Sequence, residues 1–168
     1  MDSEGLNNHM AAAPSQVFIV HGHDREALEK VRAFVDRLTN TSPYILAEQR
    51  DAGRTIIEKL EAVSGDVSFV IVLATADDVG KKDHPSSQEQ HRARQNVIFE
   101  IGYFIGKLTR KAIFFLKKGD IDIPSDLHGV VYTEMDTEGL WRNKLVRELN
   151  PIVPLDAERV SKALSMPA

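Results

Sequence analysis

The feature that most constrains the fold is a long apolar run, VSFVIVLA at residues 67–74. A run rich in valine predicts a β-strand covered on both faces, because a half-exposed strand would alternate apolar and polar side chains. Shorter apolar runs occupy residues 17–20, 44–46, 112–116 and 130–132. The sequence therefore predicts five strands, of which the longest are fully buried.

Segments with helical spacing separate the predicted strands. Asp24 is a candidate N-cap for a helix whose apolar residues recur at positions 27, 28, 31, 34, 35 and 38. Thr55 and Glu58 match a capping box for a second helix. Further helices are predicted at residues 96–108 and 138–149. Alternating strands and helices predict an α/β, flavodoxin-like fold: a doubly wound, five-stranded parallel sheet with helices on both faces.

The chain of 168 residues suits a single domain with a sizeable core. We interpret residues 1–15 as a disordered N-terminal segment or a tag remnant, and residues 16–150 as the folded domain. Residues 151–168 form a tail that either adds a short helix or links to a domain absent from this chain. Residues 77–91 are polar and contain glycine and proline, which predicts a long surface loop.

Composition limits the partners of the chain. The net charge of −4 disfavours broad attraction to nucleic acid or to an anionic membrane. No apolar run approaches the roughly 20 residues that a membrane helix needs, and the N-terminus lacks the pattern of a signal peptide. The absence of cysteine excludes disulfides and thiolate chemistry, and it fits a reducing compartment. We therefore expect a cytoplasmic protein that binds neither nucleic acid nor membrane.

A doubly wound sheet binds ligands beyond the carboxyl ends of its strands, near the point where the strand order reverses. Glu100 is expected near this rim because it lies close to the start of the helix at 96–108, about a quarter-turn from its apolar stripe. The positive end of the helix dipole favours the ionised form of a carboxylate there. A charge that borders the core must be paired or used. Glu100 is thus either a structural partner of Arg92 or Arg94, or the chemical centre of the site.

Other rim residues allow two interpretations each. Gly22 would let the backbone approach a ligand, whereas His21 and His23 either contact a ligand or hydrogen-bond within their loop. No third residue with metal-ligand spacing accompanies the histidines, so we expect no metal. Asp77 and Asp78 follow the longest strand, where they either bind ribose hydroxyls or cap a turn.

The helix at 96–108 also has a second, glycine-bearing side. Ile98, Gly102 and Gly106 share this side, with Phe99 nearby. Small residues allow a close neighbour to approach. The simpler expectation is that another helix of the same domain packs there, and the alternative is a surface for self-association.

Five motifs together resemble a known family. They are VFIVHGHD at 17–24, GRTIIEKLE at 53–61, FVIVLATADDVG at 69–80, RARQNVIFEIGYFIGKLTR at 92–110 and PSDLHGVVY at 124–132. Over roughly residues 17–150 the chain resembles the bacterial TIR-like domains of CD-NTase-associated (CBASS and Pycsar) antiphage effectors, as in TIR–STING proteins. The resemblance implies the flavodoxin-like TIR fold, which agrees with the fold expected from the strand and helix pattern.

The resemblance implies an NAD⁺ glycohydrolase that uses NAD⁺ as its substrate and needs no further cofactor. In such domains a glutamate on the helix after the third strand is catalytic, and Glu100 matches it. The expected substrate-binding residues are Gly22, His23 and Asp24 beside the phosphates or ribose, and Asp78, Arg94 and Asn96 around the sugar.

The resemblance also implies partners. TIR domains of this kind assemble, and the side around Phe99, Gly102 and Gly106 is the candidate surface. A cyclic-nucleotide sensor domain is often joined to the TIR domain. Two other functions remain open: a nucleoside deoxyribosyltransferase-like enzyme, which would also direct a glutamate at an N-glycosidic bond, and a non-enzymatic TIR or nucleotide-binding interaction module.

Overall fold

A computed structural model describes residues 16–81, 83–127 and 130–167, so the predicted segment 1–15 lies outside the described residues. Its centre is a five-stranded sheet in the order β2-β1-β3-β6-β7, in which every neighbouring pair is parallel. The strands are β1 (Gln16–His21), β2 (Tyr44–Ile45), β3 (Val67–Thr75), β6 (Ile113–Lys118) and β7 (Tyr132–Glu134). This order confirms the doubly wound, flavodoxin-like fold. From β1 the chain first adds β2 on one side and then adds β3, β6 and β7 on the other, so the strand order reverses between β1 and β3.

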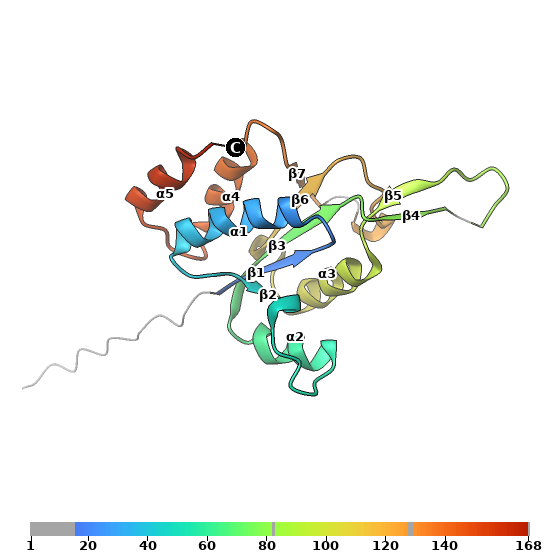
Figure 1. The fold of residues 1–168 in the computed structure, drawn as a ribbon, viewed down its shortest axis with the longest axis horizontal. Coiled ribbons are helices and arrows are strands. Elements are labelled where there is room, and N and C mark those ends of the chain that lie inside the picture. The colour runs from blue at the N-terminus through green and yellow to red at the C-terminus, as the bar shows by residue number, and fades with distance from the viewer. Residues whose placement is uncertain (1–15, 82, 128–129, 168) are drawn as a thin grey trace, which may run out of the picture.

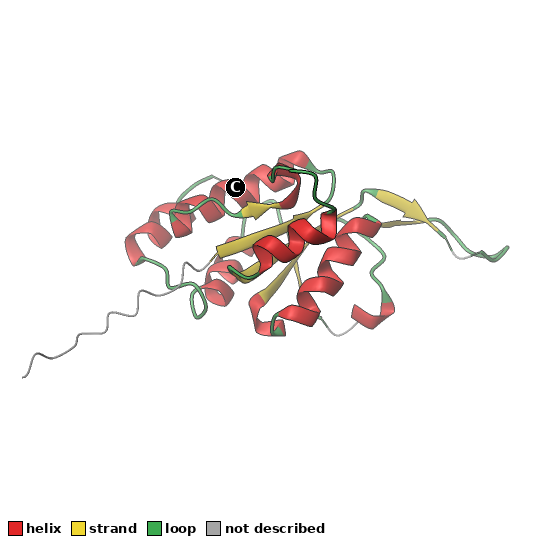
Figure 2. Ribbon diagram, turned by 90° about the horizontal axis from the view of Figure 1, so that it is seen from below, coloured by secondary structure: helices red, strands yellow, loops and turns green. Residues whose placement is uncertain are grey.

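Helices cover both faces of the sheet (Figures 1 and 2). One face carries α1 (Arg25–Thr39), α4 (Trp141–Leu149) and α5 (Ala157–Leu164), and the other carries α2 (Ile56–Ser64) and α3 (Gln95–Lys107). Alternate residues of β3 supply the two cores: Phe69, Ile71 and Leu73 pack with α1 and α4, whereas Val70, Val72 and Ala74 pack with α2 and α3. The continuous apolar run therefore reflects a strand buried on both sides.

Local signals explain where the helices begin. The Asp24 carboxylate caps α1 by accepting a hydrogen bond from the Ala27 amide at 2.9 Å. The capping box of α2 forms as predicted, since Thr55 and Glu58 each accept a hydrogen bond from the other's backbone amide. The last long helix begins at Trp141 rather than residue 138, because Gly139 adopts a positive φ of 77° and the Asp136 carboxylate accepts the Leu140 and Trp141 amides.

The predicted surface loop at 77–91 is wrong at its ends, whereas the described residues between them form no helix or strand. Its ends form a two-stranded antiparallel ribbon of β4 (Asp78–Gly80) and β5 (Gln90–Arg92), which projects from the body of the domain (Figures 1 and 2). The Asp122 amide donates to the His91 carbonyl at 2.6 Å and ties the base of this arm to the domain. The strands escaped prediction because their side chains are polar and exposed, which removes the apolar pattern.

The last sheet strand also lies two residues later than predicted. Residues 130–132 were expected in it, but Tyr132, Thr133 and Glu134 pair with β6. Val131 remains 86% exposed ahead of the strand. Valine favours strands only as a weak tendency, and here the pairing register with β6 decides the boundary.

The tail at residues 151–168 contains a short helix, which is one of the two alternatives that the sequence predicts for it. Asp156 caps α5, which packs against α1 and buries Ala163 completely. Arg142 reaches the end of this segment from α4: its Nη1 donates to the carbonyls of Met166 and Pro167 at 2.9 and 3.0 Å. A link from residues 151–168 to a further domain stays a prediction. None of the helices in the described ranges has the length and apolar character needed to cross a membrane.

Candidate active site

The sheet places the ends of β1 and β3 next to each other where the strand order reverses. Helix α3 follows β3 through the projecting arm and packs against both β1 and β3. Because α3 connects two parallel neighbours, its N-terminus returns to the carboxyl rim of the sheet. The rim therefore gathers the segment after β1, the segment after β3 and the first turns of α3.

Helix α3 places Glu100 at the edge of the core. Val97, Ile101 and Phe104 point into the core, and the Phe104 ring lies 4.7 Å from that of Phe18 between centroids. Glu100 is half-buried beside this stripe, as the helical spacing predicts. Among the described residues its carboxylate has neither a hydrogen-bond partner nor an ion-pair partner, and Arg94 acts on it only as a nearby charge. The structural alternative, a Glu100 neutralised by direct pairing, is therefore not observed.

Burial dominates the acidity of Glu100. Desolvation raises the pKa of its carboxyl from 4.5 to about 7, against the opposing effect of Arg94. The helix dipole favours the ionised form of Glu100, as expected, but it acts against the larger effect of desolvation. A helix end contributes about 0.3–1 kcal/mol, whereas each pKa unit represents about 1.4 kcal/mol, so desolvation outweighs the dipole. Near neutral pH the site holds both protonated and ionised Glu100.

Gly22 lies against a carboxylate of the protein itself. A Cβ on Gly22 would overlap the Asp77 carboxylate and would lie 3.1 Å from Thr75 Oγ1. Thr75 Oγ1 donates a hydrogen bond to Asp77 Oδ2 at 2.7 Å. The glycine is thus needed for the close approach of Asp77, a role that the sequence reading did not assign to it. Contact between Gly22 and a substrate stays a prediction.

The two histidines of the rim, His21 and His23, differ in burial. His21 is half-buried and its Nδ1 lies 2.7 Å from the Gly22 carbonyl oxygen, and burial lowers the pKa of its imidazole. His23 is exposed on the rim. Its exposure leaves it free to meet a ligand, so the predicted contact with substrate stays a prediction.

Asp24 is engaged by the protein. Besides capping α1, its carboxylate accepts a hydrogen bond from Lys118 Nζ at 2.7 Å, and this contact holds the pKa of Asp24 below its usual range. Lys118 ends β6, so the pair joins two segments of the carboxyl rim. The sequence reading missed Lys118 because its partner is 94 residues away in the chain.

The remaining predicted residues are divided between the arm and α3. Asp78 pairs opposite Arg92 in the arm, so it diverges from Asp77 although the two are adjacent in sequence. Arg94 is the half-buried N-cap residue of α3, and Asn96 is exposed in the first turn, one turn before Glu100. The structure thus brings Arg94, Asn96 and Glu100 onto one helix end and Gly22 against Asp77. It places Asp78 in the projecting ribbon.

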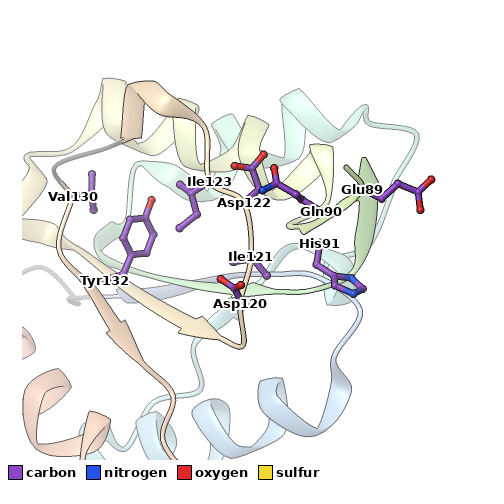
Figure 3. Close-up of a pocket in the computed structure, with 9 residues that line it drawn as sticks. All are labelled: Glu89, Gln90, His91, Asp120, Ile121, Asp122, Ile123, Val130 and Tyr132. Atoms are coloured by element: carbon purple, nitrogen blue, oxygen red, sulfur yellow. The ribbon is translucent and has the colours of Figure 1, made fainter. Parts of the chain in front are cut away.

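A cavity of about 630 Å³ lies beside this region (Figure 3). It is lined by Glu89, Gln90, His91, Asp120, Ile121, Asp122, Ile123, Val130 and Tyr132. These side chains come from the base of the arm, from the segment that connects β6 to β7 and, for Tyr132, from the start of β7 (Figure 3). Glu100 does not line this cavity. We therefore place the candidate active site at Glu100 on the carboxyl rim of the sheet, and not in this cavity.

The outer side of α3 is open. Phe99 is 48% exposed, and a Cβ on Gly102 or Gly106 would meet no atom within 4 Å among the described residues. The expectation that another helix of the domain covers this side is wrong for Phe99, Gly102 and Gly106, since α2 touches α3 elsewhere, through Ser64 and Tyr103. Ile98, by contrast, is half-buried against the core. An accessible apolar patch is left on the helix that carries Glu100.

Comparisons with known proteins agree with this architecture. The model of the CAP12/Pycsar effector TIR domain matches residues 16–137. The protein YuaY of Escherichia coli (strain K12) is 52% identical over 149 residues, which cover 88% of this chain and 49% of YuaY. Protein tirC of Dictyostelium discoideum is 40% identical over 144 residues, covering 80% of this chain and 70% of that protein.

A relative that carries the name Pycsar effector protein is also similar to this chain. The Pycsar effector protein PaPycTIR of Pseudomonas aeruginosa is 33% identical over 122 residues, covering 69% of this chain and 38% of that protein. The chain spans about half the length of YuaY and less of PaPycTIR. The matched region contains the whole sheet and the helix of Glu100. The chain therefore belongs to the CAP12/Pycsar effector TIR-domain family, the antiphage effector family that its motifs resemble.

Proposed function

We propose that this chain is a TIR-type NAD⁺ glycohydrolase in which Glu100 is the catalytic residue. The observation that carries the proposal is the half-buried Glu100 carboxyl, which has no direct partner among the described residues and lies near the N-terminal end of α3. A perturbed acid at the ligand-binding rim of a doubly wound sheet is characteristic of a functional group. Membership in the effector TIR family supports the same assignment.

The reaction suits a site with one dominant carboxylate. The bond between ribose C1′ and the nicotinamide nitrogen breaks, and its electron pair leaves with neutral nicotinamide. Water then adds to C1′ and loses a proton, which gives ADP-ribose. Nicotinamide is already a cationic leaving group, so the reaction needs no strong general acid. A carboxylate beneath the sugar stabilises the positive charge of the oxocarbenium-like transition state, or attacks C1′ covalently.

The raised pKa of Glu100 fits this chemistry. The active form is the carboxylate, since only the negative charge stabilises a cationic sugar. A partly desolvated carboxylate interacts strongly with such a charge because few water molecules screen it. Binding of the positively charged nicotinamide ring would also favour the ionised form of Glu100.

The wider role proposed for the chain is NAD⁺ depletion in antiphage defence. Assembly of TIR domains, with the exposed Phe99, Gly102 and Gly106 side of α3 as the contact surface, would bring copies together. A cyclic-nucleotide sensor domain would supply the signal in a longer protein, because relatives extend well beyond the region matched here. The Pycsar name of several relatives supports this context.

The decisive experiment measures nicotinamide release from NAD⁺ by the wild type and by Glu100→Gln, each tethered at high local density on beads. We expect turnover by the wild type and none by Glu100→Gln. Glu61→Gln, an exposed glutamate on α2, is the matched control and should retain full activity.

Equal turnover by the wild type and Glu100→Gln would contradict the catalytic assignment. Release of base from deoxynucleosides, with NAD⁺ left intact, would instead support the deoxyribosyltransferase-like alternative. Tight NAD⁺ binding without turnover at high density would support a non-enzymatic module.

A further inference from the structure

Asp77 is a second carboxylate on the same rim, distinct in position from its neighbour Asp78. We propose that Asp77 binds a hydroxyl of the nicotinamide ribose, so that it selects a ribose over a deoxyribose substrate. This inference rests on the proposed NAD⁺ glycohydrolase activity. It gives the hydroxyl contact to Asp77 and leaves Glu100 for the charge that develops at C1′.

The fold puts Asp77 where a ligand is expected. The Asp77 amide donates to the Thr75 carbonyl at 2.9 Å, so the chain turns immediately after β3. The turn brings the carboxylate against Gly22, just past the end of β1. The strand order reverses between these two strands, and this reversal point is where doubly wound sheets bind nucleotides.

The carboxylate is held in one orientation. Thr75 is only 3% exposed, and its hydroxyl donates to Asp77 Oδ2 at 2.7 Å. Gly22 lies against the same carboxylate and leaves no room for another rotamer on that side. The other oxygen, Oδ1, has no hydrogen-bond partner among the described residues, and Asp77 as a whole is half-buried. One oxygen is therefore fixed by the protein, while the other is left to accept a hydrogen bond.

The chemistry of this arrangement selects the ligand group. An ionised carboxylate only accepts hydrogen bonds, so it repels phosphate and favours a donor. Sugar hydroxyls are the donors that a dinucleotide offers near a catalytic centre at C1′. An acidic side chain accepts hydrogen bonds from a ribose hydroxyl in other doubly wound nucleotide-binding folds, although it comes there from a different strand. The adjacent Asp78 lies instead in the projecting arm, where it pairs opposite Arg92, and its predicted contact with the sugar stays a prediction.

The test compares Asp77→Asn with Asp66→Asn in the tethered chain, the same isosteric change at an exposed aspartate just before the amino end of β3. Asp77→Asn keeps an oxygen for the Thr75 hydroxyl, so a merely structural role of Asp77 would survive it. We expect a roughly tenfold lower kcat/KM for NAD⁺ with Asp77→Asn, mainly through KM, because a charge-assisted hydrogen bond is lost. Asp66→Asn should match the wild type, and the thermal unfolding curves of the wild type and both variants should coincide.

Substrate analogues distinguish a direct contact between Asp77 and a ribose hydroxyl from a purely structural role of Asp77. Two NAD⁺ analogues, one lacking the 2′-hydroxyl and one lacking the 3′-hydroxyl of the nicotinamide ribose, are compared with NAD⁺ itself. The penalty of Asp77→Asn should disappear for the analogue that lacks the hydroxyl bound by Asp77. A second variant, Thr75→Val, removes the donor that orients Asp77, and it should raise KM in the same direction by a smaller factor.

The outcomes distinguish this inference from the proposed function. Wild-type turnover together with an unchanged KM for Asp77→Asn would overturn the role of Asp77 and leave the glycohydrolase intact. A penalty that is equal for NAD⁺ and both analogues would likewise overturn the hydroxyl contact. Absence of NAD⁺ turnover by the wild type would overturn the proposed function, and the inference with it.

Discussion

At the scale of single residues, environment decides what each acidic side chain does. Asp24 is paired with Lys118 and is held ionised, whereas the half-buried Glu100 has no such partner and its pKa rises to about 7. Asp77 is oriented by Thr75 and by the missing Cβ of Gly22. These differences arise from contacts between residues far apart in the chain, so the acidic residues of the rim are not interchangeable.

The pH dependence of turnover should report on Glu100. In the proposed mechanism the ionised form of Glu100 is active, and burial raises the pKa of its carboxyl to about 7. We expect kcat/KM to rise with pH and to reach half its plateau near that value, since kcat/KM follows the protonation of the free enzyme. Initial rates at low NAD⁺ concentration between about pH 5 and 9 measure this profile. A profile that is flat through this range would contradict the assignment.

Replacing Gly22 should be costly to the fold. In Gly22→Ala the new methyl group overlaps the Asp77 carboxylate, which must move away from Thr75. We expect a loss of about 1–3 kcal/mol in the free energy of unfolding, measured by urea denaturation. Gly102→Ala is the matched control because its Cβ enters open space on a helix, so it should stabilise by about 0.5–1 kcal/mol. Equal stability of the two variants would show that Asp77 adapts without strain.

At the scale of elements, the sequence predicts the strands and helices that have a buried face, but it does not predict the exposed strands. The core strands and α1, α2 and α3 follow from apolar runs, helical spacing and caps that act locally. The arm of β4 and β5 has no buried face, so no periodicity marks it. Glu100 could be found from its place on a helix, but the pairing of Lys118 with Asp24 and the separation of Asp77 from Asp78 depend on tertiary contacts.

Helix α5 should be part of the folding unit. It buries Ala163 against α1, and the chain that follows it accepts two hydrogen bonds from Arg142, whose side chain is only 6% exposed. Deleting residues 156–168 should lower the free energy of unfolding by about 2–5 kcal/mol, because it exposes apolar surface and leaves a buried guanidinium without acceptors. Urea denaturation measures the change. Ser161→Ala, at an exposed position of α5, should stay within about 0.5 kcal/mol of the wild type.

An unchanged stability after this deletion would contradict the view that the tail belongs to the domain. It would favour the alternative in which residues 151–168 serve only as a link to another domain.

At the scale of the whole molecule, the exposed side of α3 lies next to the candidate site, so the proposed assembly would take place close to Glu100. Phe99 is adjacent to Glu100 in the chain, and it faces solvent on a surface that no described element covers. Exposed aromatic residues beside small residues allow close contact between copies. The same helix therefore carries the Glu100 carboxylate at the rim and an apolar patch that faces solvent.

Phe99→Asp should weaken self-association without unfolding the domain. We expect a lower weight-average mass in sedimentation velocity, at least tenfold less NAD⁺ turnover at high local density, and a thermal midpoint close to that of the wild type, since Phe99 is already half exposed. Val131→Asp is the matched control, because it changes an exposed apolar residue outside α3, just ahead of the edge strand β7. Loss of assembly in the control but not in Phe99→Asp would place the contact surface elsewhere.

Because burial alternates along β3, a single sheet separates two hydrophobic cores, one on each face. Phe69, Ile71 and Leu73 belong to the layer that holds the tail, whereas Val70, Val72 and Ala74 belong to the layer that holds Glu100. Mutations on one side of the sheet repack their own layer first. The layer of α1, α4 and α5 can therefore accept substitutions with little effect on the packing around α3 and Glu100.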